Sequence, residues 1–372
     1  MIYFDNAATS RPKPTEVIDA FNYFINEVGT SPGRGSYGLA IQASRMLYYS
    51  RNTVARFFHI SDASNVVFTK NSTEAINLFF DGYLKKGDHV LISPYEHNAV
   101  LRPLQTLEND GVIKYTVLPE HVIYSPDLLD KYIQNNTVLL AVTLASNLTG
   151  QLVFSAELAH RAHGYGLQVF VDASQGAGKK LIDMQRDEID FLAFTGHKDL
   201  LAVPGVGGLV SEKTLKIKPL IQGGTGIHGE SYVNPQAFPD AYEAGTLNMP
   251  AIWSLKTSME FIEKNIGLIA QKEKILLEYL EMRLIEIPRI TLYNLNRNRV
   301  PTVCFNIEGV PSNIVVEMLN NNDICVRGGI HCAIKAHETI GTVKTGAVRI
   351  SLSYNNSTEE IDTLIRVIEG FV

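Results

Sequence analysis

Six short apolar segments lie between residues 66 and 210, separated by stretches with helical spacing. Several are apolar at consecutive rather than alternate positions, which is typical of strands covered by helices on both faces. Thr73–Leu84 and Ala156–His163, between them, have apolar residues at helical spacing. Alternating strands and helices predict an α/β domain around a parallel sheet. The predicted strands are Val66–Thr69, His89–Ile92, Val138–Thr143, Val169–Val171, Phe191–Phe194 and Gly208–Val210.

The pattern changes after about residue 250. Ile252–Asn265 and Leu268–Leu284 predict two long amphipathic helices, because their apolar residues recur at three- and four-residue spacing. A smaller α+β domain should follow this helical region. Its predicted elements are a strand at Val303–Ile307, a helix at Asn313–Leu319, a strand at Val348–Leu352 and a helix at Glu359–Ile368. We expect a large domain over residues 13–258 and a small domain made of residues 1–12 and 259–372.

Composition excludes several classes of protein. Of the 372 residues, 45% are hydrophobic and 19% are charged, which excludes a disordered chain. The 33 basic and 39 acidic residues give a net charge of −6, which argues against a nucleic-acid partner. No apolar run approaches the ~20 residues of a membrane span, and the N-terminus lacks the pattern of a signal peptide. Three cysteines cannot form a disulfide framework, so we expect a reducing compartment, the cytoplasm.

Polar residues follow the predicted strands at their carboxyl ends, where open α/β sheets bind ligands. Each residue has an ordinary explanation when taken alone: Ser72 and Thr73 could be a helix cap, and Lys198 a solvated lysine. Together they supply an anion site at a helix start, an aromatic base, an acid and a lysine. Pyridoxal 5′-phosphate requires groups of these four kinds for binding. The segments, in strand order, are Asn71–Glu74, Glu96–His97, Ser146–Asn147, Asp172–Gln175 and Thr195–Lys198.

These segments, with others, make the chain resemble the cysteine desulfurase and selenocysteine lyase branch of the fold-type I, class V aminotransferase-like enzymes. The resemblance runs from end to end and implies a mostly parallel seven-stranded sheet between helices, with a smaller C-terminal α+β domain. It is carried by Phe4–Thr9, Asn71–Asn77, Glu96–Ala99, Asp172–Gln175, Thr195–Lys198, Glu243–Asn248, Arg327–Ala333, Val348–Ser351 and Tyr354–Asn355.

The resemblance also implies a role for each matching residue. Lys198 would bind the cofactor covalently, and Asp172 would pair with its pyridinium nitrogen. Arg349 would clamp the substrate carboxylate, and Cys332 would be the nucleophile. His97 would stack on the ring and move protons, with Asn147 and Gln175 holding the ring oxygen. Asn147 would also bind the substrate. The phosphate would be held by Ser72, Thr73, Thr195 and His197, with Thr246 reaching the cofactor of the other subunit of a homodimer.

The implied reaction is removal of sulfur from L-cysteine to give L-alanine and a persulfide on Cys332, which then passes its sulfur to an acceptor protein. The cysteine segment resembles the second group of desulfurases. A selenocysteine lyase and a cysteine sulfinate desulfinase are alternative functions that the sequence does not separate from this one. An ordinary aminotransferase is less consistent with the sequence, because its reaction does not use a cysteine such as Cys332. Two more distant alternatives are a dinucleotide-dependent oxidoreductase, from the glycines of Gly33–Gly38, and a metal-binding module, from Cys325, His331, Cys332 and His337.

The three cysteines have different predicted environments. Cys304 lies within a predicted strand and Cys325 between two aliphatic residues, so we expect both in the core. Cys332 follows a glycine-rich turn, where His331 and Arg327 would help to stabilise a thiolate. The following stretch, Ile334–Lys344, matches no pattern that predicts its structure.

Overall fold

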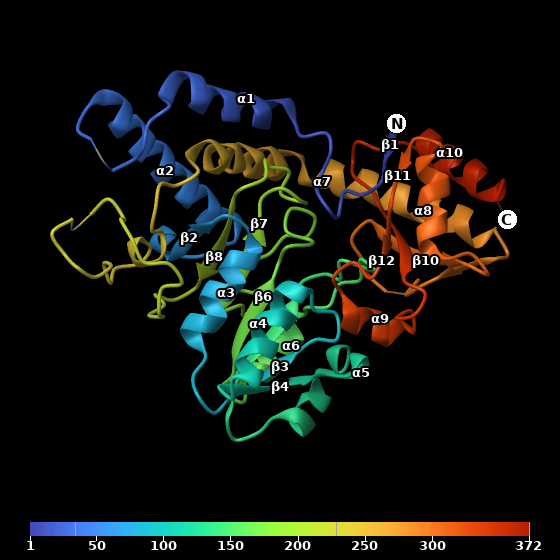
Figure 1. Cartoon of the computed structure of the whole chain (residues 1–372), viewed down its shortest axis with the longest axis horizontal. Coiled ribbons are helices and arrows are strands. Elements are labelled where there is room, and N and C mark those ends of the chain that lie inside the picture. The colour runs from blue at the N-terminus through green and yellow to red at the C-terminus, as the bar shows by residue number, and fades with distance from the viewer. Residues whose placement is uncertain (34, 228, 296, 372) are drawn as a thin grey trace.

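The computed structural model describes residues 1–33, 35–227, 229–295 and 297–371. Its centre is a seven-stranded sheet in the order β2-β8-β7-β6-β5-β3-β4, seen edge-on among helices in Figure 1. Strand β8 is antiparallel to both of its neighbours, and the other pairings are parallel. The mostly parallel sheet is therefore confirmed. The strands are β2 (Val66–Thr69), β3 (Asp88–Ile92), β4 (Ile113–Val117), β5 (Thr137–Thr143), β6 (Gln168–Asp172), β7 (Phe191–Thr195) and β8 (Gly207–Ser211).

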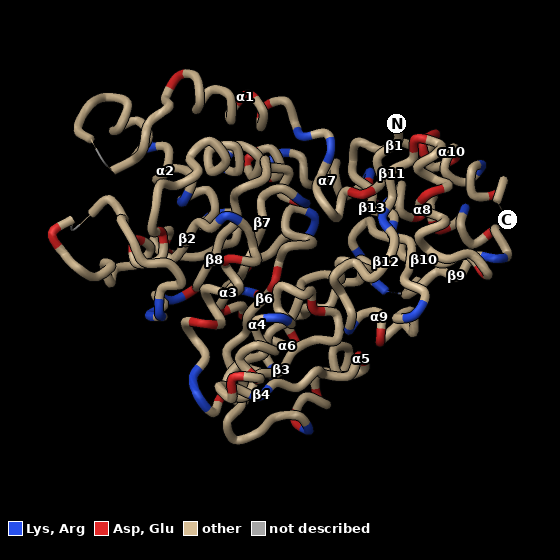
Figure 2. Tube along the Cα trace, in the orientation of Figure 1, with Lys and Arg blue, Asp and Glu red and all other residues tan. Residues whose placement is uncertain are grey.

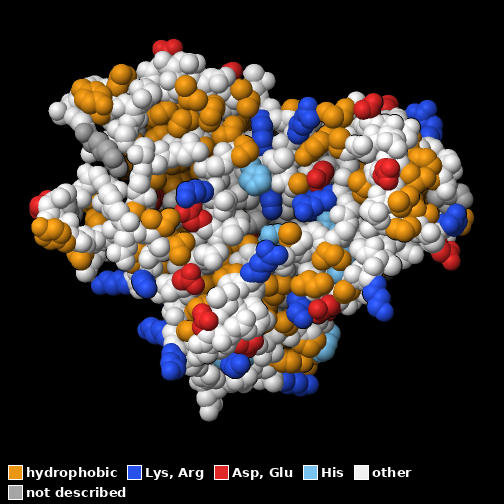
Figure 3. All heavy atoms as spheres, viewed as in Figure 1, with side chains coloured by type: hydrophobic (Ala, Val, Ile, Leu, Met, Phe, Trp, Pro, Cys, Tyr) orange, Lys and Arg blue, Asp and Glu red, His pale blue; other side chains and the backbone are white. Residues whose placement is uncertain are grey.

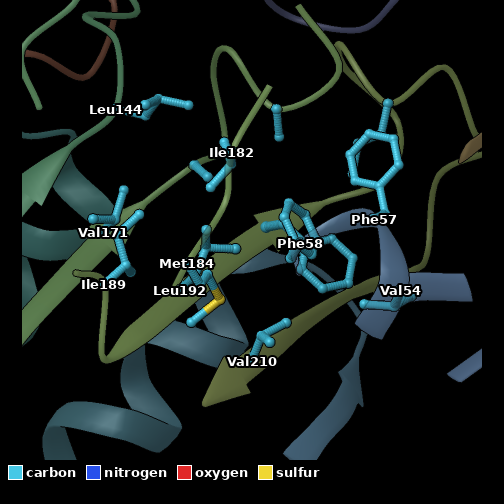
Figure 4. Packing of buried hydrophobic residues seen from close by; sticks show 14 of the residues in the cluster. Val54, Phe57, Phe58, Leu144, Val171, Ile182, Met184, Ile189, Leu192 and Val210 are labelled. Atoms are coloured by element: carbon cyan, nitrogen blue, oxygen red, sulfur yellow. The ribbon is translucent and has the colours of Figure 1, made fainter. Parts of the chain in front are cut away.

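Both faces of this sheet are covered, because successive residues of its strands enter different hydrophobic clusters. Val169 and Val171 pack into one cluster and Phe170 into the other. In Figure 4, Phe58 and Met184 lie together with Leu192 of the sheet in the first cluster. The helices are α1 (Thr15–Tyr23), α2 (Gly38–Phe57), α3 (Ser72–Tyr83), α4 (Asn98–Asn109), α5 (Glu120–Ile123), α6 (Ala156–His163), α7 (Met249–Ile285), α8 (Ser312–Asn320), α9 (Ile334–Ile340) and α10 (Thr358–Glu369), with short turns of helix at Phe24–Val28, Ala63–Asn65, Pro126–Tyr132 and Asp240–Tyr242.

Helix α7 corrects the prediction of two helices in this region, because it runs unbroken for 37 residues. Gly267 lies within it, and one glycine costs a helix only about 1 kcal/mol relative to alanine. Burial at both ends outweighs that cost: Leu255 packs with the large sheet, whereas Leu280 packs with the C-terminal elements. The predicted domain boundary near residue 258 stays a prediction.

The C-terminal part contains two further sheets. One is four-stranded and antiparallel, in the order β12-β13-β10-β9, and the other pairs β1 with β11 in parallel. The N-terminal strand therefore lies among the C-terminal elements (Figure 1). The strands are β1 (Ile2–Tyr3), β9 (Ile290–Leu292), β10 (Thr302–Ile307), β11 (Ile324–Cys325), β12 (Arg327–Gly329) and β13 (Ala347–Ser351).

The structure shows the conformation of the described residues in two segments that the sequence left unassigned, Ile334–Lys344 and Gly33–Gly38. The stretch Ile334–Lys344 forms α9 and then turns at Gly341, which adopts the left-handed conformation. The glycines of Gly33–Gly38 follow a helical segment rather than a strand, so the context of a dinucleotide-binding motif is absent from the described residues there; Arg34 lies outside the described residues.

Charged residues of both signs are interspersed along the chain (Figure 2). Within the described part of the chain, none of the helices combines the length and the apolar character needed to cross a bilayer.

Candidate functional site

A cavity of about 180 Å³ lies at the carboxyl ends of the central strands. It brings together residues that are far apart in the sequence and that we predicted as cofactor ligands. A larger cavity, of about 780 Å³, contains none of them. The smaller cavity is lined by Asn71, Ser72, Thr73, His97, Thr143, Asn147, Asp172, Ser174, Gln175, Thr195, His197 and Lys198.

The start of α3 forms an anion cradle at one end of this cavity. The side chain of Asn71 caps the helix by accepting a 3.0 Å hydrogen bond from the Glu74 amide. The amides of Ser72 and Thr73 at the helix start are the groups that an anion can bind. Gly207 permits this arrangement, because a Cβ there would lie 2.8 Å from Cα of Asn71. The Thr195 hydroxyl is buried without a hydrogen-bond partner, so it can bind a polar group of a ligand.

Lys198 lies in the loop that follows β7, beside this cradle. Burial lowers its pKa below the usual value, against the opposing charge of Asp172. The N-terminal segment holds the loop, because Lys13 Nζ donates to the His197 carbonyl at 2.6 Å and Thr9 Oγ1 donates to the same oxygen at 3.0 Å. Burial also lowers the pKa of His197 to about 4, so its ring is neutral near pH 7.

Asp172 and His97 approach the cavity from the ends of β6 and β3, which lie on either side of β5. Asp172 ends β6, and its Oδ1 accepts hydrogen bonds from the amide and hydroxyl of Ser174 at 2.9 and 2.5 Å. His97 caps α4, and its Nδ1 accepts from the Ala99 amide at 3.0 Å. The proton of the neutral ring must therefore sit on Nε2. Burial, with the charge of Lys198, lowers the pKa of His97 to about 4.

Asn147 and Gln175 are both buried and are anchored to other parts of the chain. Gln175 donates to the Ala7 carbonyl at 2.8 Å. Asn147 Nδ2 donates to the His331 carbonyl at 2.7 Å, and its Oδ1 is buried without a partner. Asn147 therefore offers an acceptor to a ligand and also joins the cavity to the cysteine segment.

Arg349 lies behind Asn147 rather than in the cavity lining. Its Nη1 donates to the Asn147 carbonyl at 2.8 Å, and its Nη2 donates to Asp5 Oδ1 at 2.5 Å. Nε is buried without a partner. Burial lowers the pKa of this guanidinium, with Asp5 opposing the shift. Sequence reasoning matched the segment around Asp5 to a motif but missed this pairing, which joins residues 344 positions apart.

Cys332 lies on the wall of a separate groove of about 440 Å³, which shares Thr73 and His97 with the cavity. Its carbonyl accepts a 2.8 Å hydrogen bond from the Asn98 amide, so the cysteine segment is fixed beside His97. Both His331 and Cys332 have a φ of about 55°, in the left-handed region that costs a non-glycine residue energy.

The surroundings of the cysteines correct two predictions. Burial lowers the pKa of His331 to about 3, so this neutral ring brings no positive charge to the Cys332 thiol. Instead its Nε2 faces the Arg327 carbonyl at 3.2 Å. Cys304 is buried as predicted, and burial raises its pKa, whereas Cys325 is only partly buried because it lies on the short strand β11.

Thr246 and Glu96 do not line the cavity. Thr246 is exposed and does not line the cavity of its own chain, so its contact with a second subunit stays a prediction. Glu96 is fully buried next to His97, accepts from the Thr143 amide at 2.7 Å, and has its pKa raised to about 8 by burial. Sequence reasoning gave Glu96 no role, and only its place before His97 pointed to it. No cluster of three potential metal-ligating His, Cys, Asp or Glu side chains occurs in the described ranges.

Comparison with known proteins agrees with this geometry. The model of the aminotransferase class-V family matches residues 2–364. A probable cysteine desulfurase of Methanothermobacter thermautotrophicus is 32% identical, over 99% of this chain and 94% of its own, and one of Synechocystis is 30% identical, over 100% and 91%.

Two solved structures have the same fold. The apo cysteine desulfurase of Thermococcus onnurineus NA1 has a TM-score of 0.91 at 30% identity, covering 100% of this chain and 94% of its own. The cysteine desulfurase CsdA of Escherichia coli has a TM-score of 0.89 at 28% identity, covering 99% and 94%. With a family match over nearly its whole length, this chain belongs to the class-V aminotransferase family, alongside proteins named cysteine desulfurases.

Proposed function

We propose that this protein is a pyridoxal-phosphate-dependent cysteine desulfurase that converts L-cysteine to L-alanine and carries the sulfur as a persulfide on Cys332. The observation that carries the proposal is the hydrogen bond between the Cys332 carbonyl and the Asn98 amide. It fixes a partly exposed cysteine beside His97, at the border between the cavity and the outer groove. The relatives named cysteine desulfurases over the full chain support the same activity.

The residues of the cavity fit pyridoxal phosphate. Ser72, Thr73 and the unpartnered Thr195 hydroxyl suit its phosphate, Asp172 suits its ring nitrogen, and Lys198 suits its aldehyde carbon. The buried lysine carries a lowered pKa, so its amine is available for bonding. When bound, the cofactor withdraws electrons from the substrate and makes its Cα proton acidic.

The remaining chemistry belongs to side chains of this chain. Arg349 binds the substrate α-carboxylate through planar, charge-assisted hydrogen bonds. Lys198 Nζ accepts the Cα proton, and His97 can exchange a proton only at Nε2, since its Nδ1 is occupied. The Cys332 thiolate then forms an S–S bond with the substrate sulfur as the substrate Cβ–S bond breaks. The electron pair left on carbon takes up a proton, which gives alanine.

Transfer of the sulfur onward requires access to Cys332 from outside. The groove beside it runs between α3 and α4, and a thiolate of an acceptor protein can approach along it. Attack on the outer sulfur makes a new persulfide on the acceptor and returns the Cys332 thiolate. Because this thiol works only while it is free, we propose a reducing compartment, the cytoplasm.

We also propose that the protein forms a homodimer through the face that carries α1 and α2. Hydrophobic side chains gather over these helices in Figure 3, and large apolar patches of this kind mark interaction sites. A partner on this face would bring Thr246 towards the other subunit's cofactor. Sedimentation should show a dimer. The exposed apolar residues of this face include Ile18, Tyr23, Ile25, Leu39, Ile41, Tyr48 and Tyr49.

The activity is tested by incubating the purified, cofactor-loaded protein with L-cysteine and a reductant. Wild type should release alanine and sulfide in equal amounts. Cys332→Ala should keep the visible absorption of the cofactor but release no sulfide, whereas Cys325→Ala, a matched control, should behave as wild type. Normal desulfuration by Cys332→Ala would refute the proposal. Parallel reactions with L-selenocysteine measure the preference between the two substrates.

A further inference from the structure

A buried group of three charged side chains lies outside the cavity, where four segments of the chain meet. Lys179, in the loop after β6, pairs with Glu273 of α7, and its Nζ lies 3.8 Å from Asp199 Oδ1. The side chains of Lys179, Asp199 and Glu273 are 11%, 6% and 4% exposed. Charges with so little access to water are costly to bury, and removal of one partner leaves the others uncompensated.

Each carboxylate of this triad also binds a backbone amide of a segment that serves the site. Asp199 directly follows Lys198, and its Oδ2 accepts from the Gly176 amide at 2.7 Å. Glu273 accepts from the Tyr354 amide at 3.2 Å. Tyr354 lies shortly after β13, the strand that carries Arg349. The triad therefore joins the loop of the cofactor lysine to the strand of the carboxylate-binding arginine.

The backbone around Lys179 is built for this close approach. The Lys179 amide closes a turn onto the Gly176 carbonyl at 2.9 Å. Gly178 has a φ of +95°, and a Cβ there would lie 2.5 Å from the Asp199 carbonyl oxygen. Two further cations interact with Asp199: Lys198, and Lys13, whose Nζ is bonded to Ser10 and to the His197 carbonyl.

We infer that Lys179 is a positioning residue, which acts through Asp199 and Glu273 to hold the loop of Lys198 and the strand of Arg349 in place relative to each other. The inference rests on the proposed function, since it takes Lys198 as the group that holds the cofactor and accepts the Cα proton, and Arg349 as the group that binds the substrate carboxylate. Misplacement of reacting groups by about 1 Å can slow a reaction by about a hundredfold.

The test uses the cofactor-loaded enzyme and the variants Lys179→Met, which removes the charge, and Lys179→Arg, which keeps it. L-Alanine serves as a probe that binds both ends of the site without desulfuration, followed by the change in cofactor absorption. Lys179→Met should raise the Kd for L-alanine and the KM for L-cysteine by about tenfold, and should lower kcat as well, because a displaced Lys198 removes the Cα proton less efficiently. Lys179→Arg should restore these values to near those of wild type.

The control is Lys274→Met, which removes an exposed lysine from α7, the helix that carries Glu273, and should change none of these constants. If Lys179→Met fails to fold, Glu273→Gln takes its place, because it removes the charge but can still accept from the Tyr354 amide. A variant that unfolds more easily yet binds L-alanine as wild type does would overturn the inference and leave a purely structural triad. Failure of the proposed function gives a different result: L-cysteine stays intact in wild type, while Lys179→Met still binds L-alanine more weakly than wild type does.

Discussion

Replacing Arg349 with lysine should weaken substrate binding far more than it slows turnover. The guanidinium is 1% exposed, and two of its nitrogens are already engaged by the Asn147 carbonyl and by Asp5. It has enough donors to keep these bonds and still bind a carboxylate, whereas a lysine presents all its donors from one nitrogen. The variant keeps a positive charge and loses the planar geometry.

The size of the effect follows from the number of bonds lost. One charge-assisted hydrogen bond is worth about 1.5–3 kcal/mol, which corresponds to a rise of roughly 10- to 150-fold in KM. Since the carboxylate is bound equally in the ground state and the transition state, kcat should change little. Steady-state kinetics with L-cysteine measure both constants. The control is Arg56→Lys, which alters an exposed ion pair with Glu263 and should change neither KM nor kcat. An Arg349→Lys enzyme with unchanged KM and reduced kcat would refute the assigned role.

Two further predictions concern the lysine and the buried acid. Lys198→Ala should lose the visible absorption of bound cofactor on dialysis, because no other described lysine lines the cavity; retention of a covalently bound cofactor would contradict this. The pKa of Glu96 is about 8 in the folded state and near its ordinary value of 4.5 in the unfolded state. Between these two pH values the folded protein keeps the Glu96 proton, whereas the unfolded chain releases it. Stability should therefore fall by up to about 1.4 kcal/mol per pH unit between about pH 4.5 and 8. Urea unfolding at several pH values should show a weaker decline for Glu96→Gln than for wild type or for the exposed control Glu278→Gln; equal slopes in all three would contradict the assignment.

The sequence predicted most of the central sheet because its inner strands are apolar at consecutive positions. Strand β4 was missed, since Ile113–Val117 includes polar residues and pairs with a neighbour on one side only. The single helix α7 was also missed. Gly267 lies between the two segments predicted as separate helices, and packing at both ends of α7 keeps the helix continuous there.

The cavity residues could be predicted because each follows a strand, and the ends of parallel strands meet at one edge of a sheet. The contacts that orient them could not. Two of these contacts are ion pairs between residues far apart in the sequence, Asp5 with Arg349 and Lys179 with Glu273. No local sequence pattern predicts either pair. The protonation state of His331 could not be predicted either. His331 is adjacent to Cys332 in the sequence, but burial lowers its pKa and keeps its ring neutral.

The position of the transferred sulfur tests the central claim most directly. Cofactor-loaded wild type would be given L-cysteine without reductant for a single turnover, alkylated, digested and analysed by mass spectrometry. The three cysteines serve as their own controls, since Cys304 is buried and Cys325 lies on a strand outside the cavity. One additional sulfur on the peptide of Cys332, and on neither of the others, is the predicted result. Alanine formed with no persulfide on Cys332, or with the sulfur on another cysteine, would contradict the assignment.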